Sequence, residues 1–375
     1  MFIPVNKPVI DQGNEAKYLQ ECIETGWVSS EGPFVDRFEK EFAHKVGRQF
    51  GVSVSNGTTA LDLACEAVGI TRGDEVIVPA FTIVSCVHQI LRVGAKPIFV
   101  DSDLTHWNMR VDEIEKKITP KTKAILMVHI YGLPANVDEI LELARRHNLY
   151  VIEDAAEMHG QTYRGKYCGS FGDISTFSFY PNKHITTGEG GMLLTDSKIL
   201  SERIRSLRNL CFNDENRFVH ERLGWNARMT NMQAALGVAQ LEQLDTFVEK
   251  KRFIGEWYNK AFVDLVKLQL PLRDTYYAKN IYWVYGILLP KEYGITAKKF
   301  MSELNNLGVG TRPFFAPLDD QPFLECYGIK RSGNCLGARQ LHDFGFYIPS
   351  GLALTEPELE YVSEKVKLIY SKLLG

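Results

Sequence analysis

Lys183 lies where an enzyme would place a reactive amine. An apolar, aromatic stretch (175–179) precedes it, and the glycine-rich Gly188-Glu189-Gly190-Gly191 follows. A lysine does covalent work when its pKa is lowered or when a carbonyl cofactor captures it, and partial burial favours both. Most lysines do neither, and this chain has 43 lysines and arginines. The interpretation therefore depends on the residues that accompany Lys183.

Asp154 is the first of these companions. It closes the apolar stretch 149–154, and the carboxyl ends of parallel strands are where α/β folds bind ligands. A carboxylate there can hold a positively charged ring nitrogen. Taken alone, however, Asp154 is better explained as the N-cap of a helix that begins at Ala155.

A loop that enters a helix at residues 55–61 is the second companion. Its small residues, Gly57, Thr58 and Thr59 among them, can surround a phosphate at the positive end of the helix dipole, although an ordinary helix cap explains them too. A lysine for an imine, an aspartate for a ring nitrogen and a phosphate cradle together specify pyridoxal 5'-phosphate better than any other cofactor.

Other chemistries lack their signals. The segment 188–191 lacks the GxGxxG spacing and leads into an apparent strand, so a nicotinamide oxidoreductase is disfavoured. The sequence contains neither a Walker A motif nor HExxH. His129, His159 and His184 are scattered, and we predict no metal site.

Alternating elements must position these residues. Short apolar runs at 75–79, 97–101, 124–129, 149–154, 175–179 and 191–195 suit buried strands, and helical patterns at 58–68, 137–146 and 198–208 separate most of them. This alternation predicts an α/β fold with a largely parallel sheet covered on both sides.

The pattern changes after about residue 245. A charged helix (247–262), a strand (282–289), a helix (297–307) and a C-terminal helix from Pro357 indicate a smaller α+β domain. We therefore predict a large cofactor-binding domain at 1–245 and a small domain at 246–375.

The composition is that of an ordinary globular protein. A formal charge of -3 and 24% charged residues give no electrostatic case for nucleic acid or an anionic membrane. The seven cysteines form no CxxC pair, and no signal peptide or membrane-spanning stretch is apparent, so we expect a cytoplasmic protein with reduced thiols.

Five ordered motifs resemble the DegT/DnrJ family of nucleotide-sugar aminotransferases. They lie at 55–61, 152–156, 172–178, 182–191 and 224–231, and the likeness extends to residues 27–30. The resemblance implies a fold-type I aminotransferase, with a mixed, mostly parallel seven-stranded sheet and a small C-terminal domain. It also implies a homodimer with shared active sites.

The resemblance assigns roles residue by residue. Lys183 would bind the cofactor covalently and shuttle the proton, and Asp154 would bind the pyridine nitrogen. The phosphate would be held by Gly57, Thr58 and Ser178, with Thr59 nearby, and by Asn226 of the other subunit. The predicted substrate contacts are Trp27, Ser29, His184, Arg312 and Phe314.

Two positions depart from the common family pattern. Glu157 stands where many members have a glutamine, so a carboxyl group would have to contact the phenolic oxygen of the cofactor. Ile83 stands where many members stack an aromatic on the cofactor ring, and Phe81 is the candidate substitute.

The implied reaction moves the amino group of glutamate to the 4-keto carbon of a nucleotide-linked 4-keto-6-deoxy sugar. The context of residues 311–318 is most similar to members that act on GDP-4-keto-6-deoxymannose, while dTDP- and UDP-linked sugars stay open. Arg312 suits a diphosphate, and a surface ion pair explains it equally well. A non-catalytic protein that binds a sugar nucleotide is the remaining alternative.

Overall fold

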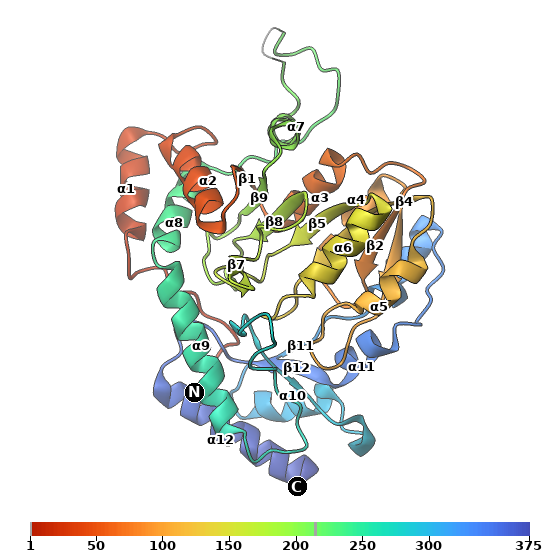
Figure 1. Ribbon diagram of the computed structural model, residues 1–375. Helices are drawn as coiled ribbons and strands as arrows, with labels where there is room; N and C mark the ends of the chain where they lie inside the picture. The colour runs from red at the N-terminus through yellow and green to blue at the C-terminus, as the bar shows by residue number, and fades with distance from the viewer. Residues whose placement is uncertain (1, 214–215) are drawn as a thin grey trace.

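A seven-stranded mixed sheet forms the centre of the large part of the molecule (Figure 1). The computed structural model describes residues 2–213 and 216–375. The strand order is β1-β9-β8-β5-β4-β2-β3, in which β9 runs antiparallel to both neighbours and the other adjacent pairs are parallel. The strands are β1 (Phe50–Val54), β2 (Glu75–Pro79), β3 (Lys96–Val100), β4 (Thr122–Val128), β5 (Tyr150–Asp154), β8 (Ile174–Ser178) and β9 (Gly191–Thr195). The predicted fold class is confirmed.

The central strands are buried on both faces. In β4, Ile125 and Met127 join one core cluster, whereas Ala124 and Leu126 join the other. Side chains of a strand alternate between the two faces, so a strand covered on both sides is apolar at successive positions. The six predicted strands accordingly lie within two residues of the observed ones, while β1 was not predicted.

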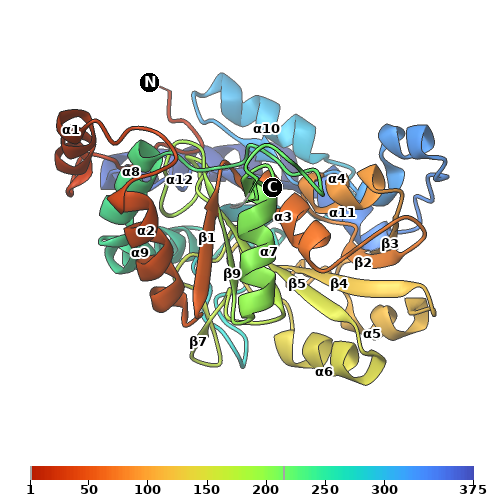
Figure 2. The same cartoon turned by 90° about the horizontal axis from the view of Figure 1, so that it is seen from above.

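Helices cover both faces of the sheet. Figure 2 shows α3 and α7 on one side of the sheet and α2 and α6 on the other. The first side comprises α3 (Gly57–Ala67), α4 (Ser85–Arg92) and α7 (Lys198–Arg208). The second comprises α2 (Pro33–Val46), α6 (Val137–His147) and α8 (Asn231–Leu241). α1 (Glu15–Thr25) packs on α8, and the short α5 (Val111–Ile114) and the hairpin β6 (Thr162–Tyr163) and β7 (Lys166–Tyr167) complete this part.

A three-stranded antiparallel sheet lies below the large sheet in Figure 1. It consists of β10 (Tyr285–Leu288), β12 (Gly345–Ile348) and β11 (Arg312–Pro313), and it packs with α10 (Ala297–Asn306), α11 (Leu336–Phe344) and α12 (Glu356–Leu374). Ile3 near the N-terminus forms a bridge with Val309 in this part. The long helix α9 (Leu244–Ala261) joins the two parts, because Phe247 packs in the large core and Tyr258 in the small one. The division at residue 245 stays a prediction.

The strand predicted at 282–289 begins only at Tyr285. Tyr282 has a φ of 50°, and a left-handed residue cannot continue an extended strand. The amide of Tyr282 instead donates to Asn280 Oδ1 at 2.6 Å. This local conformation was not visible in the apolar pattern, and it places Trp283 toward the site described below.

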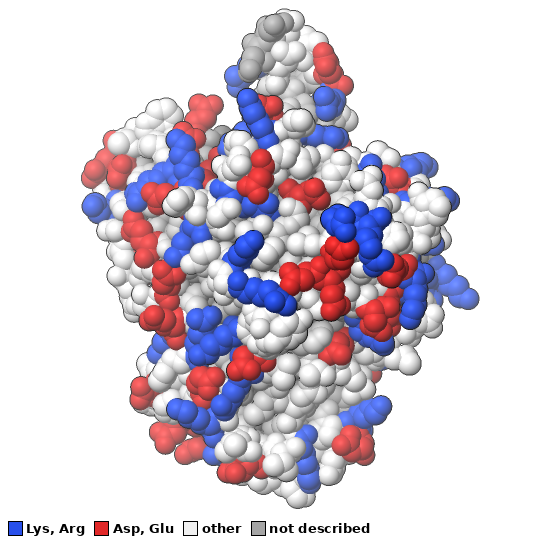
Figure 3. Space-filling model, in the orientation of Figure 1, with Lys and Arg blue, Asp and Glu red and all other residues white. Residues whose placement is uncertain are grey.

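The surface charges are mixed. Acidic and basic side chains alternate over the face in Figure 3. Over the described residues, the helices include none whose length and hydropathy would suit it to cross a membrane.

Candidate active site

Lys183 follows β8 in a tight turn between the two parts of the molecule. Its amide donates to the Tyr180 carbonyl at 2.9 Å, and its side chain is half-buried. The Nζ atom lies 4.0 Å from the centroid of the Trp283 ring. Burial lowers the pKa of Lys183, although the nearby carboxyl groups of Glu157 and Asp154 oppose the shift. The amine is therefore easier to deprotonate than an exposed lysine.

Asp154 ends β5, as predicted, and is 4% exposed. Its Oδ1 accepts the Ala156 amide at 3.0 Å, and its Oδ2 lies 3.6 Å from the Cys86 sulfur, which donates to it. No helix begins at Ala155, so the N-cap explanation is wrong. Burial raises the pKa of Asp154, while the Ala156 amide and the Lys183 amine oppose that shift.

Glu157 lies close enough to Lys183 and Asp154 for both groups to influence its pKa. It is 7% exposed, and its Oε2 accepts the Tyr131 amide at 2.7 Å. Burial raises its pKa to about 8, against the opposing effects of Lys183 and the Tyr131 amide. Glu157 is therefore mainly protonated at neutral pH and, like a glutamine, offers a hydrogen-bond donor.

The N-terminus of α3 packs against the end of β8. An added Cβ at Gly57 would lie 2.7 Å from the Ser178 Cβ, so only glycine permits this approach. Asn56 caps the helix by accepting the Thr59 amide at 2.8 Å, and the Thr58 and Ser85 hydroxyl oxygens are 2.8 Å apart. The cap explanation thus holds for Asn56, and the predicted phosphate residues Gly57, Thr58 and Ser178 are brought together at the positive end of the helix.

Phe81 is fully buried in an aromatic cluster. The centroids of Tyr131, Phe314 and Phe315 each lie 5.8 Å from that of Phe81. Ile83, by contrast, is 47% exposed. Phe314 is 2% exposed in the same cluster. The contact of Phe81 with the cofactor ring and the contact of Phe314 with the substrate stay predictions.

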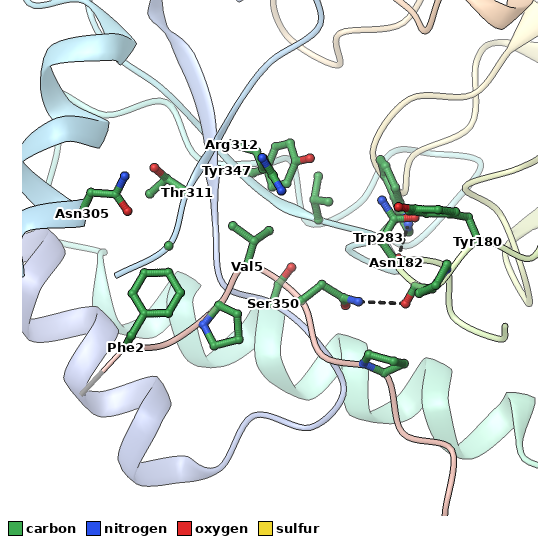
Figure 4. Close-up of a pocket in the computed structure, with 16 residues that line it drawn as sticks. Phe2, Val5, Tyr180, Asn182, Trp283, Asn305, Thr311, Arg312, Tyr347 and Ser350 are labelled. Carbon is green, nitrogen blue, oxygen red and sulfur yellow. Dashed lines mark hydrogen bonds between the residues drawn. The ribbon is translucent and has the colours of Figure 1, made fainter. Parts of the chain in front are cut away.

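Arg312 lines a pocket that reaches the turn of Lys183. The pocket has a volume of about 480 Å³, and Figure 4 shows Tyr180, Asn182 and Trp283 at one end and Arg312, Thr311 and Tyr347 farther along. The N-terminal segment forms another wall, where the Asn6 side-chain amide donates to the Pro181 carbonyl at 2.8 Å. Arg312 forms no ion pair with any residue of 2–213 or 216–375, which disfavours the ion-pair explanation.

The remaining predicted residues differ in their exposure. Trp27, Ser29 and Asn226 are exposed on this single chain. His184 is 2% exposed, and burial holds its pKa well below the usual range. Their assigned contacts stay predictions.

One cluster has the composition of a metal site. The ligand atoms of His129, Glu153 and Cys168 lie within 4.8 Å of one another. His129 Nε2 is 3.0 Å from Glu153 Oε1, and its Nδ1 accepts the Ala135 amide at 3.1 Å. Glu153 also accepts the Gly169 and Phe171 amides. These hydrogen bonds already occupy both ring nitrogens, and we assign the cluster a structural role.

Three neighbours of the site were not predicted. Trp283 contacts the Lys183 amine, Cys86 donates to Asp154, and the Tyr131 amide donates to Glu157. Each is distant in sequence from the residue it contacts. A φ of 57° at Tyr131 contributes to this arrangement, and no sequence signal marked it.

The comparisons with known proteins agree with this geometry. The profile of the DegT/DnrJ/EryC1/StrS aminotransferase family matches residues 9–367. The GDP-perosamine synthase of Escherichia coli O157:H7 is 43% identical over 99% of both chains, and that of Vibrio cholerae is 43% identical over 98% of both. Among solved structures, the aminotransferase TlmJ from Streptoalloteichus hindustanus superposes with a TM-score of 0.93 and 29% identity over the whole of both chains.

Proposed function

The chain belongs to the DegT/DnrJ/EryC1/StrS family of sugar aminotransferases, which use pyridoxal phosphate, and we propose that it converts GDP-4-keto-6-deoxymannose to GDP-perosamine with glutamate as amino donor. The observation that carries the choice of substrate is the 43% identity to two GDP-perosamine synthases over nearly the full length of the chains. The family and the cofactor do not depend on that choice.

The residues present fit pyridoxal phosphate. A half-buried amine, a buried carboxyl group at a strand end and a glycine-lined helix N-terminus supply partners for its carbonyl, its ring nitrogen and its phosphate. When bound, the cofactor acts as an electron sink that stabilises negative charge on the carbon attached to the amino group. We assign Lys183, Asp154 and the pair Gly57 and Ser178 to these three contacts.

The chain's own residues would control the protons. Lys183 Nζ, with its lowered pKa, can take up a proton and return it. Asp154 would accept a hydrogen bond from the ring nitrogen and keep that nitrogen protonated. Glu157, which burial keeps protonated near neutral pH, would donate to the phenolic oxygen. A carboxyl group can thus take the place of the glutamine that many members carry.

The pocket beside Lys183 would hold the nucleotide sugar. Its volume of about 480 Å³ lies within the range usual for small-molecule sites. Arg312 has no ion-pair partner among the described residues, and its planar guanidinium matches the geometry of a diphosphate. We place the sugar toward Asn182 and the diphosphate toward Arg312.

A second copy of the chain would complete the site. The exposure of Trp27, Ser29 and Asn226 leaves them free to contact a partner. Phe218 and Leu223, which follow α7 in the sequence, are 80% and 89% exposed. Apolar residues this exposed favour an interface, and we propose a homodimer in which Asn226 reaches the phosphate of the other subunit.

The test is an assay of the purified protein with pyridoxal phosphate, glutamate and, separately, GDP-, dTDP- and UDP-linked 4-keto-6-deoxy sugars. Mass spectrometry follows the amino-sugar product. We expect product with the GDP sugar. Product with only another nucleotide would overturn the substrate, and binding of a sugar nucleotide without any product would favour a non-catalytic protein.

A further inference from the structure

We propose that Trp283 is a positioning residue for Lys183 and that Lys251 in turn holds Trp283 in place. The Trp283 ring centroid lies 4.0 Å from Lys183 Nζ. The indole N–H donates to the carbonyl of Asn182, the residue before Lys183, at 2.8 Å. One side chain therefore contacts both the amine and the backbone that carries it. The proposal rests on the assignment of Lys183 as the cofactor-binding lysine.

The backbone that leads into Trp283 is tightly constrained. Tyr282 has a φ of 50°, which is rare for a bulky residue, and its amide donates to Asn280 Oδ1 at 2.6 Å. Gly132 packs so closely that an added Cβ would lie 2.9 Å from the backbone nitrogen of Trp283. Strained conformations of this kind persist only where their surroundings enforce them, and they cluster at active sites.

Lys251 provides the second constraint on Trp283. This residue of α9 is 4% exposed, and it forms no ion pair within the described part of the chain. Its Nζ donates to the carbonyls of Trp283 and Ser350 at 2.8 Å and 2.6 Å. Trp283 precedes β10 and Ser350 follows β12, so one amine ties two neighbouring points of the small sheet to α9.

A lysine without a carboxylate partner is costly to bury. Burial lowers the pKa of Lys251 to about 7, which reflects this cost. The hydrogen bonds to the two carbonyls are the contacts that compensate for it. Because one of those carbonyls belongs to the residue that contacts Lys183, the position of Lys251 bears directly on the active amine.

The aromatic face has an electrostatic effect on Lys183. A ring near an ammonium group stabilises its charged form and so opposes the effect of burial on the pKa. The other ionisable groups that act on Lys183 are Glu157, Asp154 and Cys86, and all three raise its pKa. The buried rings of His159 and His184 lie nearby, and burial keeps both neutral. Removal of the Trp283 ring should therefore lower the pKa of Lys183 further.

The experiment measures the pKa of Lys183 in the cofactor-free protein. Trace labelling with acetic anhydride at a series of pH values, followed by peptide mass spectrometry, reports the free-amine fraction at each lysine. We expect Trp283→Leu to lower the apparent pKa of Lys183 by about one unit. Trp283→Phe keeps an aromatic face and should lower it by less. Trp257→Leu, at a partly buried position of α9 that packs against the small core, is the matched control and should leave the pKa of Lys183 unchanged.

Lys251→Met tests the second half of the proposal. It keeps an unbranched side chain of similar length but removes both donated hydrogen bonds, so the ring should be held less firmly and the pKa of Lys183 should fall by less than in Trp283→Leu. Lys260→Met, at the exposed end of the same helix, is the control. Circular dichroism checks that each variant folds.

An unchanged pKa of Lys183 in Trp283→Leu, or in Trp283→Phe if the leucine variant does not fold, would overturn the proposal. An unchanged pKa in Lys251→Met would remove Lys251 from it. The labelling needs neither cofactor nor substrate, so failure of the aminotransferase assignment would appear separately, as an absence of cofactor binding or of product.

Discussion

Burial shifts the pKa values of Lys183, Asp154 and Glu157 toward their uncharged forms. It lowers the pKa of Lys183 and raises those of Asp154 and Glu157, and attraction between the amine and the carboxyl groups opposes each shift. A neutral amine can accept a proton, and a protonated carboxyl group can donate one. Shifted pKa values of this kind are typical of catalytic sites, where proton transfer near neutral pH is required.

Glu157→Gln should change the pH dependence of stability in the cofactor-free protein. Glu157 loses its proton near pH 4.5 in the unfolded chain but keeps it to about pH 8 in the folded protein. The folded state therefore binds more protons between these values, and the free energy of unfolding falls as the pH rises through them. Glutamine escapes this loss, so the variant should gain on the order of 3 kcal/mol over the wild type between pH 4.5 and 8.

Urea unfolding of both proteins at pH 5 and pH 8 measures this difference. Glu24→Gln, at an exposed position of α1, is the control and should follow the wild type. Parallel pH dependence in Glu157→Gln and the wild type would show that Glu157 is ionised in the folded protein.

Arg312→Ala should weaken binding of the nucleotide sugar but not of glutamate. Loss of a charge-assisted contact to the diphosphate should raise the KM for that substrate by about tenfold or more, whereas the KM for glutamate should stay the same. Arg312→Lys keeps the charge but loses the planar guanidinium, so its KM for the nucleotide sugar should lie between those of the wild type and Arg312→Ala. Steady-state kinetics checks this, with Arg145→Ala on α6 as control. Equal changes in both KM values would contradict the assignment.

At the scale of single elements, the contact between α3 and β8 depends on one glycine. Gly57→Ala would bring a methyl group within 2.7 Å of the Ser178 Cβ and push apart the two elements that would hold the cofactor phosphate. We expect about a tenfold or greater loss of pyridoxal phosphate affinity, measured by absorbance titration.

Gly13→Ala is the matched control for that experiment. Its added Cβ would meet the flexible end of the Gln243 side chain, which can move away. Unchanged cofactor affinity in Gly57→Ala would show that this contact does not shape the phosphate site.

The sequence predicted the strands that are buried on both faces, because such strands are apolar at successive positions. The apolar runs of β2 and β9 match the observed strands residue for residue, because a strand covered on both faces carries its own signal. The predicted start of β10 was wrong by three residues. The left-handed backbone conformation of Tyr282 results from its contacts with Gly132 and Asn280, which the local sequence does not reveal.

The site was predictable to the extent that single residues reveal their chemistry. Lys183 and Asp154 lie in motifs beside strand ends and could be proposed from the sequence. Trp283 could not, because 100 residues separate it from Lys183 and its position depends on Lys251, a residue of α9. The protonated state of Glu157 likewise follows from burial, which is a property of the fold.

At the scale of the whole molecule, mixed dimers test whether two subunits share each site. Lys183→Ala and Asn226→Ala should each abolish or strongly reduce activity. If Asn226 serves the partner's site, a mixed dimer contains one intact site and one doubly altered site. Random association of equal amounts should then restore about a quarter of wild-type activity. No recovery after coexpression, with mixed dimers confirmed by mass spectrometry, would place both residues in the same chain's site.

The central claim is that Lys183 is the amine that captures pyridoxal phosphate. The most direct measurement is borohydride reduction of the protein with bound cofactor, followed by peptide mass spectrometry to locate the pyridoxyl group. Lys251 is a demanding internal control, since it is more deeply buried than Lys183 and its pKa is lowered as well. We predict the modification on Lys183 and none on Lys251. Modification of Lys251 or of any other lysine, with Lys183 unmodified, would contradict the account.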